Sequence, residues 1–291
     1  MADDTLQPAP MLHWIRERER IRVRKERGDA PPWTDDPILS GYRFCCVRRE
    51  DDRGTIWIRR NIREPYADHP MLWLMLCIGR QINWPNTLNW LMTAWGAWPD
   101  SDGFEPRLMT AAMNVRKSLG EKLYTGAYVI SAPSTKGADK QAYICEQVIG
   151  EQWNRRDGFA RHFAGQPSLR TTHERLTRVK GWGPFMAYQA VVDMRFTKLL
   201  SGAEDVSIWA AAGPGTLRGL NRIHGRAVDY ALSQGQALSE MRAIYRIVQQ
   251  ETGVHMDFSD VPNILCETDK YLRVKNGEGK PRALYVPGRG S

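Results

Sequence analysis

The sequence predicts a mainly α-helical protein, and three observations predict this class. After residue 40, most of the 291-residue chain shows apolar side chains at helical spacing. Hydrophobic residues make up 42% of the chain, with eleven Trp and eleven Met, which is enough for a sizeable core. A β-branched, aromatic and Gly/Ser-rich pattern stands out only at residues 122–137, where we expect a small hairpin or irregular insert.

The expected helices follow one another along the chain. Residues 14–30 mix basic and acidic side chains, which predicts an exposed helix ended by Gly28. Residues 70–82 are apolar on nearly every face, so we expect a central buried helix there. A helix over 106–119 starts with proline and stops at Gly120. Further helices are expected over 86–98, 139–153, 155–163, 169–180, 184–200, 225–249 and 260–271.

Charge and composition suggest the organisation and the kind of partner. We expect a basic N-terminal arm over residues 1–32, one helical domain over 33–275 and a flexible tail over 276–291. The net charge of +8 favours polyanionic partners, with nucleic acid first. Neither a membrane-spanning apolar run nor a signal peptide is visible, so we expect a soluble, intracellular protein without a membrane partner.

Cysteine spacing argues against metal clusters and disulfides. The cysteines show no C-x-x-C pairing, which disfavours a zinc site, an iron–sulfur cluster or a disulfide framework. Reduced thiols are therefore expected at Cys45, Cys46, Cys77, Cys145 and Cys266.

The stretch "KGWGPF" places a glycine-rich turn between two predicted helices. Gly181 and Gly183 can adopt positive φ and let another backbone approach closely. The helix that starts at Pro184 offers unpaired N–H groups, which can bind an anion such as a DNA phosphate. An ordinary helix–helix turn would explain the same pattern without DNA. The predicted DNA-binding residues are Lys180, Gly181, Trp182 and Gly183.

The turn resembles the hairpin of the helix-hairpin-helix DNA glycosylases. The shared pattern is apolar-x-Gly-x-Gly-x-x-x-Ala, with Val179 at the apolar and Ala187 at the small position. This resemblance implies a glycosylase-like helical fold and a catalytic Asp further along the chain, where Asp205 stands. The lysine of bifunctional glycosylases is absent, because Phe185 occupies the matching position.

Five further motifs carry a second resemblance, which runs from about residue 33 to residue 273. Their order is similar to that in the alpha-glutamyl/putrescinyl-thymine pyrophosphorylase group, whose fold is shared with the helical domain of 5-hydroxymethyluracil DNA kinases. One departure is Cys45-Cys46, where Thr-Asn is expected. The motifs are "YRFCCVRREDDRGTIWI" (42–58), "CIGRQIN" (77–83), "YQAVVDM" (188–194), "AAGPGTLRGLNRI" (211–223), which we expect to form a second Gly-rich loop, and "DVPNILCETDKYLR" (260–273).

The second resemblance implies a bacteriophage enzyme of thymine hypermodification, acting on double-stranded DNA in the cytoplasm of an infected bacterial host. We expect a transferase that flips the modified base and replaces the phosphate or pyrophosphate on its 5-hydroxymethyl group with an amino acid or polyamine. Because the sequence has no GxxxxGK[ST] phosphate loop, we expect the enzyme to act after a separate 5-hydroxymethyluracil DNA kinase.

The site residues follow from that chemistry. An amine must lose a proton before it attacks, so we expect a carboxylate base: Asp193 first, because it follows an apolar run, and Asp205 second. Gln189 would support a buried carboxylate, Arg48 would stabilise the leaving phosphate, and Asp52 is a further catalytic candidate. Mg²⁺ is compatible with such a reaction, although no dedicated site stands out. The candidates for binding the substrate or its phosphate are Arg53, Arg80, Asn83, Gly213, Gly215, Arg218, Glu267 and Lys270.

Two other functions stay open at this point. A true DNA glycosylase would need only the hairpin and Asp205, and would leave "VRREDDR" and "CETDKYLR" unexplained. A non-catalytic DNA-binding subunit of a modification complex would make these carboxylates ordinary surface groups.

Overall fold

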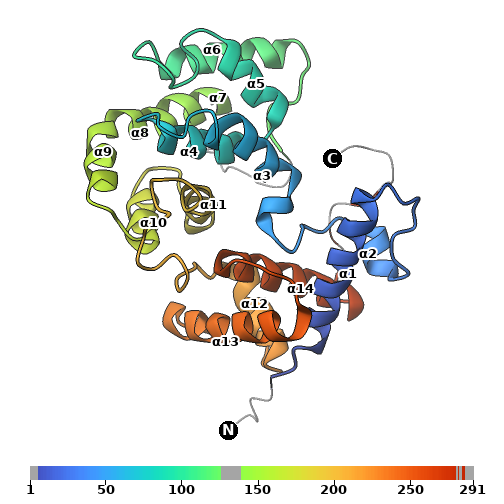
Figure 1. Ribbon diagram of the computed structural model, residues 1–291. Coiled ribbons are helices and arrows are strands. Elements are labelled where there is room, and N and C mark those ends of the chain that lie inside the picture. Colours follow the sequence, from blue (N-terminus) through green and yellow to red (C-terminus); the bar gives the residue numbers. More distant parts are fainter. Residues whose placement is uncertain (1–5, 126–138, 280, 282–283, 286–291) are drawn as a thin grey trace. The chain divides into compact units, whose positions relative to one another are not determined.

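The structure is a computed structural model that describes residues 6–125, 139–279, 281 and 284–285. It is mainly α-helical, as predicted (Figure 1). Among the described residues, strand-like pairing consists of a single antiparallel bridge between Tyr42 and Leu284. Most of the insert predicted at 122–137 lies outside the described residues. In the described part of the chain, no helix combines the length and the apolar character needed to cross a membrane.

Backbone contacts divide the chain into two compact units. The first unit comprises residues 1–52 and 207–291, and the second comprises residues 53–206. The second unit is therefore inserted into the sequence of the first. The predicted arm, domain and tail, with boundaries at residues 33 and 275, are a different division and stay a prediction.

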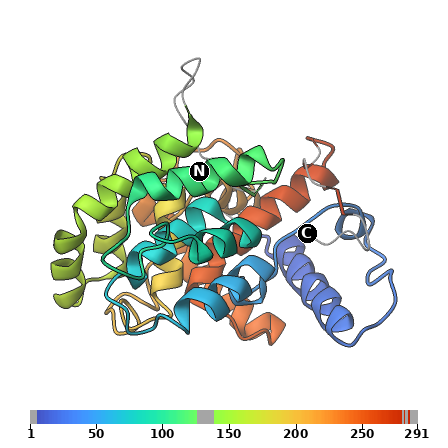
Figure 2. The ribbon, with the colours of Figure 1, turned by 90° about the horizontal axis from the view of Figure 1, so that it is seen from above.

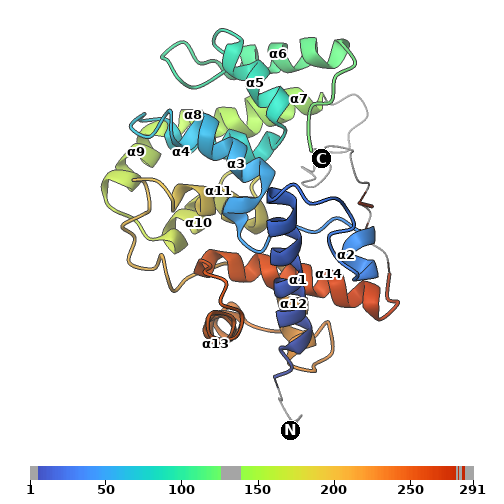
Figure 3. The same ribbon diagram turned by 45° about the vertical axis from the view of Figure 1, so that its right-hand side comes forward.

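The first unit is built around two closely packed helices, α12 (Pro214–Ile223) and α14 (Val261–Lys275) (Figure 3). A β-carbon on Gly219 would collide with the Leu265 carbonyl, and one on Gly215 would collide with the Cys266 thiol. Both glycines therefore let the helices approach closely. Helix α1 also packs against α14 and crosses it (Figure 2 and Figure 3, blue and red). The other elements of this unit are α1 (Ala9–Glu26), α2 (Pro37–Gly41), the 3₁₀ turns Arg49–Asp51 and Phe258–Asp260, and α13 (Gln234–Thr252).

The second unit surrounds the buried helix α4 (Leu72–Ile82). All residues of α4 are buried, which confirms the central buried helix that the sequence predicted. On α4, the Trp73 ring stacks on Phe159 with ring centroids 4.2 Å apart. Helix α11 packs against both α4 and α10. The remaining elements are α3 (Arg53–Ile58), the π-helical turns Arg59–Arg63 and Tyr143–Ile149, α5 (Pro85–Thr93), α6 (Pro106–Ser118), α7 (Lys140–Ala142), α8 (Gly150–Asn154), α9 (Arg156–Ala164), α10 (Leu169–Thr177) and α11 (Pro184–Met194).

Three predictions of local structure were wrong: two concern the ends of helices, and one concerns a whole helix. The helix expected from residue 225 begins at Gln234, because Ser233 and Gln236 form a capping box there. The helix expected to reach residue 200 ends at Met194, where the Thr197 hydroxyl donates to the Met194 carbonyl. The Gly-rich stretch at 211–223 was expected to be a loop, yet it contains helix α12.

Candidate functional site

In the turn between α10 and α11, positive φ was predicted for both glycines, and one of the two adopts it. Gly181 has a φ of +79°, and a β-carbon there would lie 2.6 Å from Val148 Cγ2. A side chain at Gly181 would therefore be unfavourable both for its backbone conformation and for its contact with Val148. Gly183 instead has an ordinary φ of −80° and is the N-cap of α11, with no heavy atom within 4 Å of a built β-carbon.

This turn lies at the surface of the second unit. Gly181, Gly183 and Pro184 are exposed, and the Phe185 ring is 48% exposed. Trp182 is only 4% exposed, so its side chain anchors the turn from below. Open space at an exposed helix N-terminus is the arrangement that an anion needs to reach backbone N–H groups.

Side chains from neighbouring helices hold the turn in place. His173 of α10 lies with Nε2 2.9 Å from the Pro184 carbonyl oxygen. The Lys180 ammonium donates to Gln147 Oε1 at 2.9 Å, and the Lys180 N–H donates to Glu151 at 3.1 Å. The exposed Lys180 ammonium therefore lies beside the turn and forms no ion pair with a carboxylate of the described residues.

Positive charge is concentrated in the second unit. This unit holds 20 Lys and Arg against 14 Asp and Glu, a net charge of +6 out of +8 for the whole chain. The segment 155–180, which leads into the turn, has seven basic and two acidic residues. Within it, Arg161 and Arg178 are exposed and form no ion pair with any described residue. The turn is thus flanked by charge that favours a polyanion.

Asp193, the predicted base, lies in the interior of the second unit. Its carboxylate accepts two hydrogen bonds from Arg80, at 2.5 and 2.7 Å, and the two side chains are 1% and 3% exposed. Arg80 also donates to the Thr55 hydroxyl at 2.9 Å. Nine residues separate Asp193 from Pro184 on α11, which is about 13 Å along a helix. The structure therefore joins two predicted residues, Asp193 and Arg80, away from the hairpin turn.

Asp205, the second predicted base, caps the N-terminus of α10. Its carboxylate oxygens accept hydrogen bonds from the Leu169 and Arg170 N–H groups, at 2.7 and 3.0 Å. Together with the N-cap Ser168, whose side chain accepts from the Thr171 N–H, this contact satisfies N–H groups at the beginning of α10. Its predicted catalytic role is untested and stays a prediction.

The other predicted residues of the second unit are spread along its helices. Gln189 is 4% exposed, on the buried part of α11. Asn83 ends α4 in the left-handed conformation, with a φ of +45°. Arg53 is an exposed residue at the beginning of α3.

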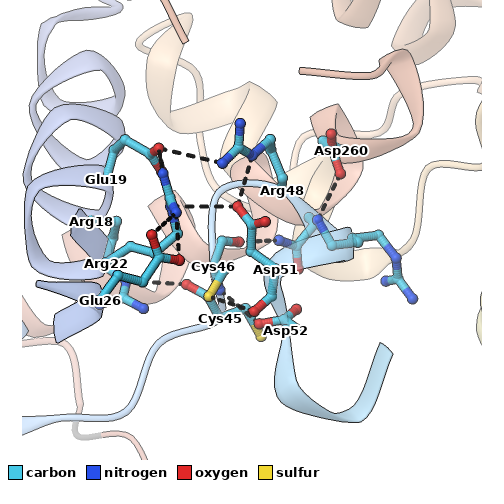
Figure 4. A network of polar contacts seen from close by, with 12 residues as sticks. Arg18, Glu19, Arg22, Glu26, Cys45, Cys46, Arg48, Asp51, Asp52 and Asp260 are labelled. Atoms are coloured by element: carbon cyan, nitrogen blue, oxygen red, sulfur yellow. Dashed lines mark hydrogen bonds and ion pairs between the residues drawn. The ribbon is translucent and has the colours of Figure 1, made fainter. Parts of the chain in front are cut away.

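A second polar cluster lies in the first unit, around the turn at residues 44–52 (Figure 4). Three carboxylates there share one role, because each accepts a hydrogen bond from a backbone N–H of the turn. The Asn263 side chain also donates to the Cys46 carbonyl at 3.0 Å. These contacts fix the backbone of the turn from both sides. The carboxylate pairs are Glu267 with Cys45 (3.0 Å), Asp52 with Cys46 (2.8 Å) and Asp260 with Arg49 (2.9 Å).

Four predicted site residues meet in this cluster: Arg48, Asp52, Glu267 and Lys270. Arg48 donates to Asp51 at 2.7 Å, and Lys270 lies 3.1 Å from Glu267. Arg218 pairs with Asp269 at 2.9 Å and stays 42% exposed. Gly213 and Gly215 stand at the beginning of α12, where the close packing of α12 on α14 accounts for the glycine at 215.

Burial shifts the titration of several groups in the cluster. It raises the pKa of Asp52, and it raises the pKa of Asp260 to about 6. Burial also raises the pKa of the Cys46 thiol to about 12 and that of Cys266 to about 11. The two thiols are thus protonated at neutral pH, and both cysteines are free in the structure.

Two residues of this cluster were missed by sequence reasoning. Asp260 holds the Arg49 N–H, and Arg49 itself is only 7% exposed. Arg49 lies in the motif "VRREDDR", whose density of charge was a signal, but nothing in the sequence separates it from Arg48. Across the described residues, no group of three or more His, Cys, Asp or Glu is placed to hold a metal ion.

Comparison with known families defines the class: a helical domain of DNA-modifying proteins. Residues 9–281 match the model of the family described as "5-hmdU DNA kinase, helical domain", so the chain belongs to this family. A curated relative named "5-hmdU DNA kinase", from Bacillus phage SP10, is 26% identical over an alignment of 286 residues that covers 88% of this chain. The chain spans 43% of the length of that relative. No solved structure matches the chain.

These comparisons confirm one part of the predicted resemblance and correct the predicted function. The helical-domain family of the kinases is confirmed, whereas the pyrophosphorylase group and the glycosylase-like fold are not. The predicted amine transferase is wrong, because both the family and the curated relative are named for a kinase. The amine co-substrate and the separate preceding kinase lose their support with it.

Proposed function

We propose that this chain acts in the phosphorylation of 5-hydroxymethyluracil in phage DNA, as the helical domain that holds the DNA substrate. The family match over residues 9–281 is the single observation that carries this proposal. The relative from a Bacillus phage supports a phage-encoded activity inside an infected bacterium. The aligned region covers 43% of the length of that relative.

The proposed reaction is a phosphoryl transfer to a hydroxyl group. The hydroxymethyl oxygen of the base attacks the terminal phosphorus of a nucleoside triphosphate. The new O–P bond forms while the bond to the nucleoside diphosphate breaks, and the hydroxyl proton leaves to a base. Positioning of the acceptor and stabilisation of the phosphoryl charge supply most of the rate in such reactions.

The hairpin of the second unit is the proposed DNA contact. Its open helix N-terminus can accept a DNA phosphate at the backbone N–H groups beside Gly183, while Lys180 and Arg178 add charge. Trp182 would support this contact indirectly, since it is buried under the turn. The net charge of +6 on this unit supports binding of a polyanion.

Asp52 is the carboxylate that we propose for the proton transfer. Both oxygens of Asp193 accept from Arg80 and both oxygens of Asp205 accept from α10 N–H groups, whereas the backbone hydrogen bond to Asp52 uses only Oδ1. Asp52 accepts the Cys46 N–H, and burial raises its pKa, which makes it a better proton acceptor near neutral pH. Asp52→Asn should therefore slow phosphorylation strongly, while Asp51→Asn, which removes the partner of Arg48, should not.

A direct test uses two duplexes that differ at one base. The chain is incubated with Mg²⁺ and γ-³²P-labelled ATP, and with a duplex that contains 5-hydroxymethyluracil or thymine at the same position. Binding of both duplexes is measured in parallel. Label that enters only the first duplex, or tighter binding of the first duplex without label, supports the proposal. No label together with equal affinity for both duplexes would contradict it.

A further inference from the structure

Arg49 differs from the other arginines of the cluster in the first unit. Arg18 donates to the Cys45 carbonyl at 3.1 Å, Arg22 pairs with Glu19 and Glu26, and Arg48 pairs with Asp51. The Arg49 side chain has no hydrogen bond or ion pair with any described residue, and its Nε atom is fully buried without a partner. Arg49 is nevertheless only 7% exposed.

Burial of a guanidinium that lacks hydrogen-bond partners lowers the stability of the folded protein. Such a residue is therefore expected to have another role. Taking a charge out of water costs free energy unless hydrogen bonds and an opposite charge compensate. The surrounding turn does not relax to expose Arg49, because Asp260 holds its backbone N–H at 2.9 Å. The Cys45 and Cys46 amides are held by Glu267 and Asp52 in the same way.

Asp52 and Asp260 lie close enough to Arg49 for its charge to act on their pKa values, but neither carboxylate accepts a hydrogen bond from its side chain. Asp260 uses its two oxygens for the Arg49 and Asp257 N–H groups, and Asp52 accepts the Cys46 N–H. Burial raises the pKa of both carboxyl groups, and it raises that of Asp260 to about 6. The N–H donors of the Arg49 guanidinium therefore stay available to a ligand.

We propose that Arg49 is a phosphate-binding residue, whose guanidinium pairs with phosphate oxygens of the substrate. The planar fork of five N–H donors matches a phosphate group in geometry and charge. The phosphate belongs either to the DNA backbone or to a nucleoside triphosphate. This inference rests on the proposed function for its choice of substrate, and it is tested by binding alone, without phosphoryl transfer.

The experiment compares Arg49→Met with Arg43→Met. Arg43 lies in the same unit, and its side chain donates to the Leu284 carbonyl at 3.1 Å, so its loss removes an equal charge outside the cluster. Affinities for pyrophosphate, ATP and a 5-hydroxymethyluracil duplex are measured for each protein. We expect Arg49→Met to weaken at least one of these ligands about tenfold, and Arg43→Met to leave all three within about twofold.

The pattern of losses identifies the source of the phosphate. Loss of pyrophosphate and ATP affinity alone assigns Arg49 to the nucleotide, and loss of duplex affinity alone assigns it to the DNA backbone. Equal affinities in both variants would overturn the proposal, even if the duplex were phosphorylated. Thermal unfolding adds a second readout, because removal of an unpaired buried charge should not lower the melting temperature. If Arg49→Met does not fold, Arg49→Lys, which keeps the charge but loses the fork, should still weaken the same ligand, and unchanged affinity would overturn the proposal.

Discussion

The role of a single residue in the second unit depends on which distant part of the chain its side chain contacts. Asp193 and Arg80 are 113 residues apart in sequence, yet they form a two-point ion pair that is almost fully buried. Apolar residues before Asp193 correctly indicated burial. They did not identify Arg80 as the partner, because a helical pattern shows which face of a helix is buried but not which side chain packs against it.

Asp193→Asn should destabilise the fold by about 3–5 kcal/mol, because it leaves the Arg80 charge buried and uncompensated. The free energy of unfolding in urea measures this loss. The double variant Arg80→Met/Asp193→Leu removes both charges and should recover most of the stability. A single variant as stable as the wild type would show that the pair is not important for folding.

His162 provides a pH-dependent test at the same scale. Burial and the nearby Arg175 charge lower its pKa from 6.5 to about 4 in the folded protein. Between pH 6.5 and pH 4, His162 is therefore protonated in the unfolded chain and neutral in the folded chain. Protonation of the unfolded chain lowers the free energy of unfolding as the pH falls through this range. His162→Gln should lose less stability than the wild type between pH 7.5 and pH 5. His255→Gln, at an exposed position, is the control, and parallel pH profiles for wild type and His162→Gln would contradict the expectation.

Individual helices were predicted well where their own sequence determines them. The central helix α4 and the helix α6, between a leading proline and Gly120, lie where periodicity and end signals placed them. Helix α12 was missed because its glycines suggested a loop. Gly215 and Gly219 are instead needed for contact with α14, and such a contact cannot be read from local sequence.

Gly181→Ala should destabilise the hairpin between α10 and α11. A side chain there must adopt a φ of +79° and lie against Val148, which we expect to cost about 1–3 kcal/mol. Gly202→Ala is the matched control, since it has no positive φ and no heavy atom within 4 Å of a built β-carbon. Melting temperatures of the two variants check this prediction, and an equal change in both would contradict the account of the turn.

For the molecule as a whole, the composition is consistent with the proposed DNA partner, whereas the predicted reaction is not supported. The net charge of +8 pointed to a polyanion, and the structure assigns +6 of it to the unit with the exposed hairpin. The predicted reaction was wrong, because the shared motifs of related modification enzymes describe a common scaffold and not one activity. The motifs did indicate the helical-domain family of the kinases, and the match over residues 9–281 confirms it.

DNA affinity of Gly183→Val tests the central claim most directly. Gly183 has an ordinary φ and open space around it, so the variant should fold, yet its side chain would cover the N–H groups proposed to hold a phosphate. Gly202→Val is the control in the same unit. We expect Gly183→Val to bind a 5-hydroxymethyluracil duplex about tenfold more weakly, with a salt dependence reduced by about one phosphate contact. Equal affinity and equal salt dependence for Gly183→Val, Gly202→Val and wild type would contradict the claim that this hairpin holds DNA.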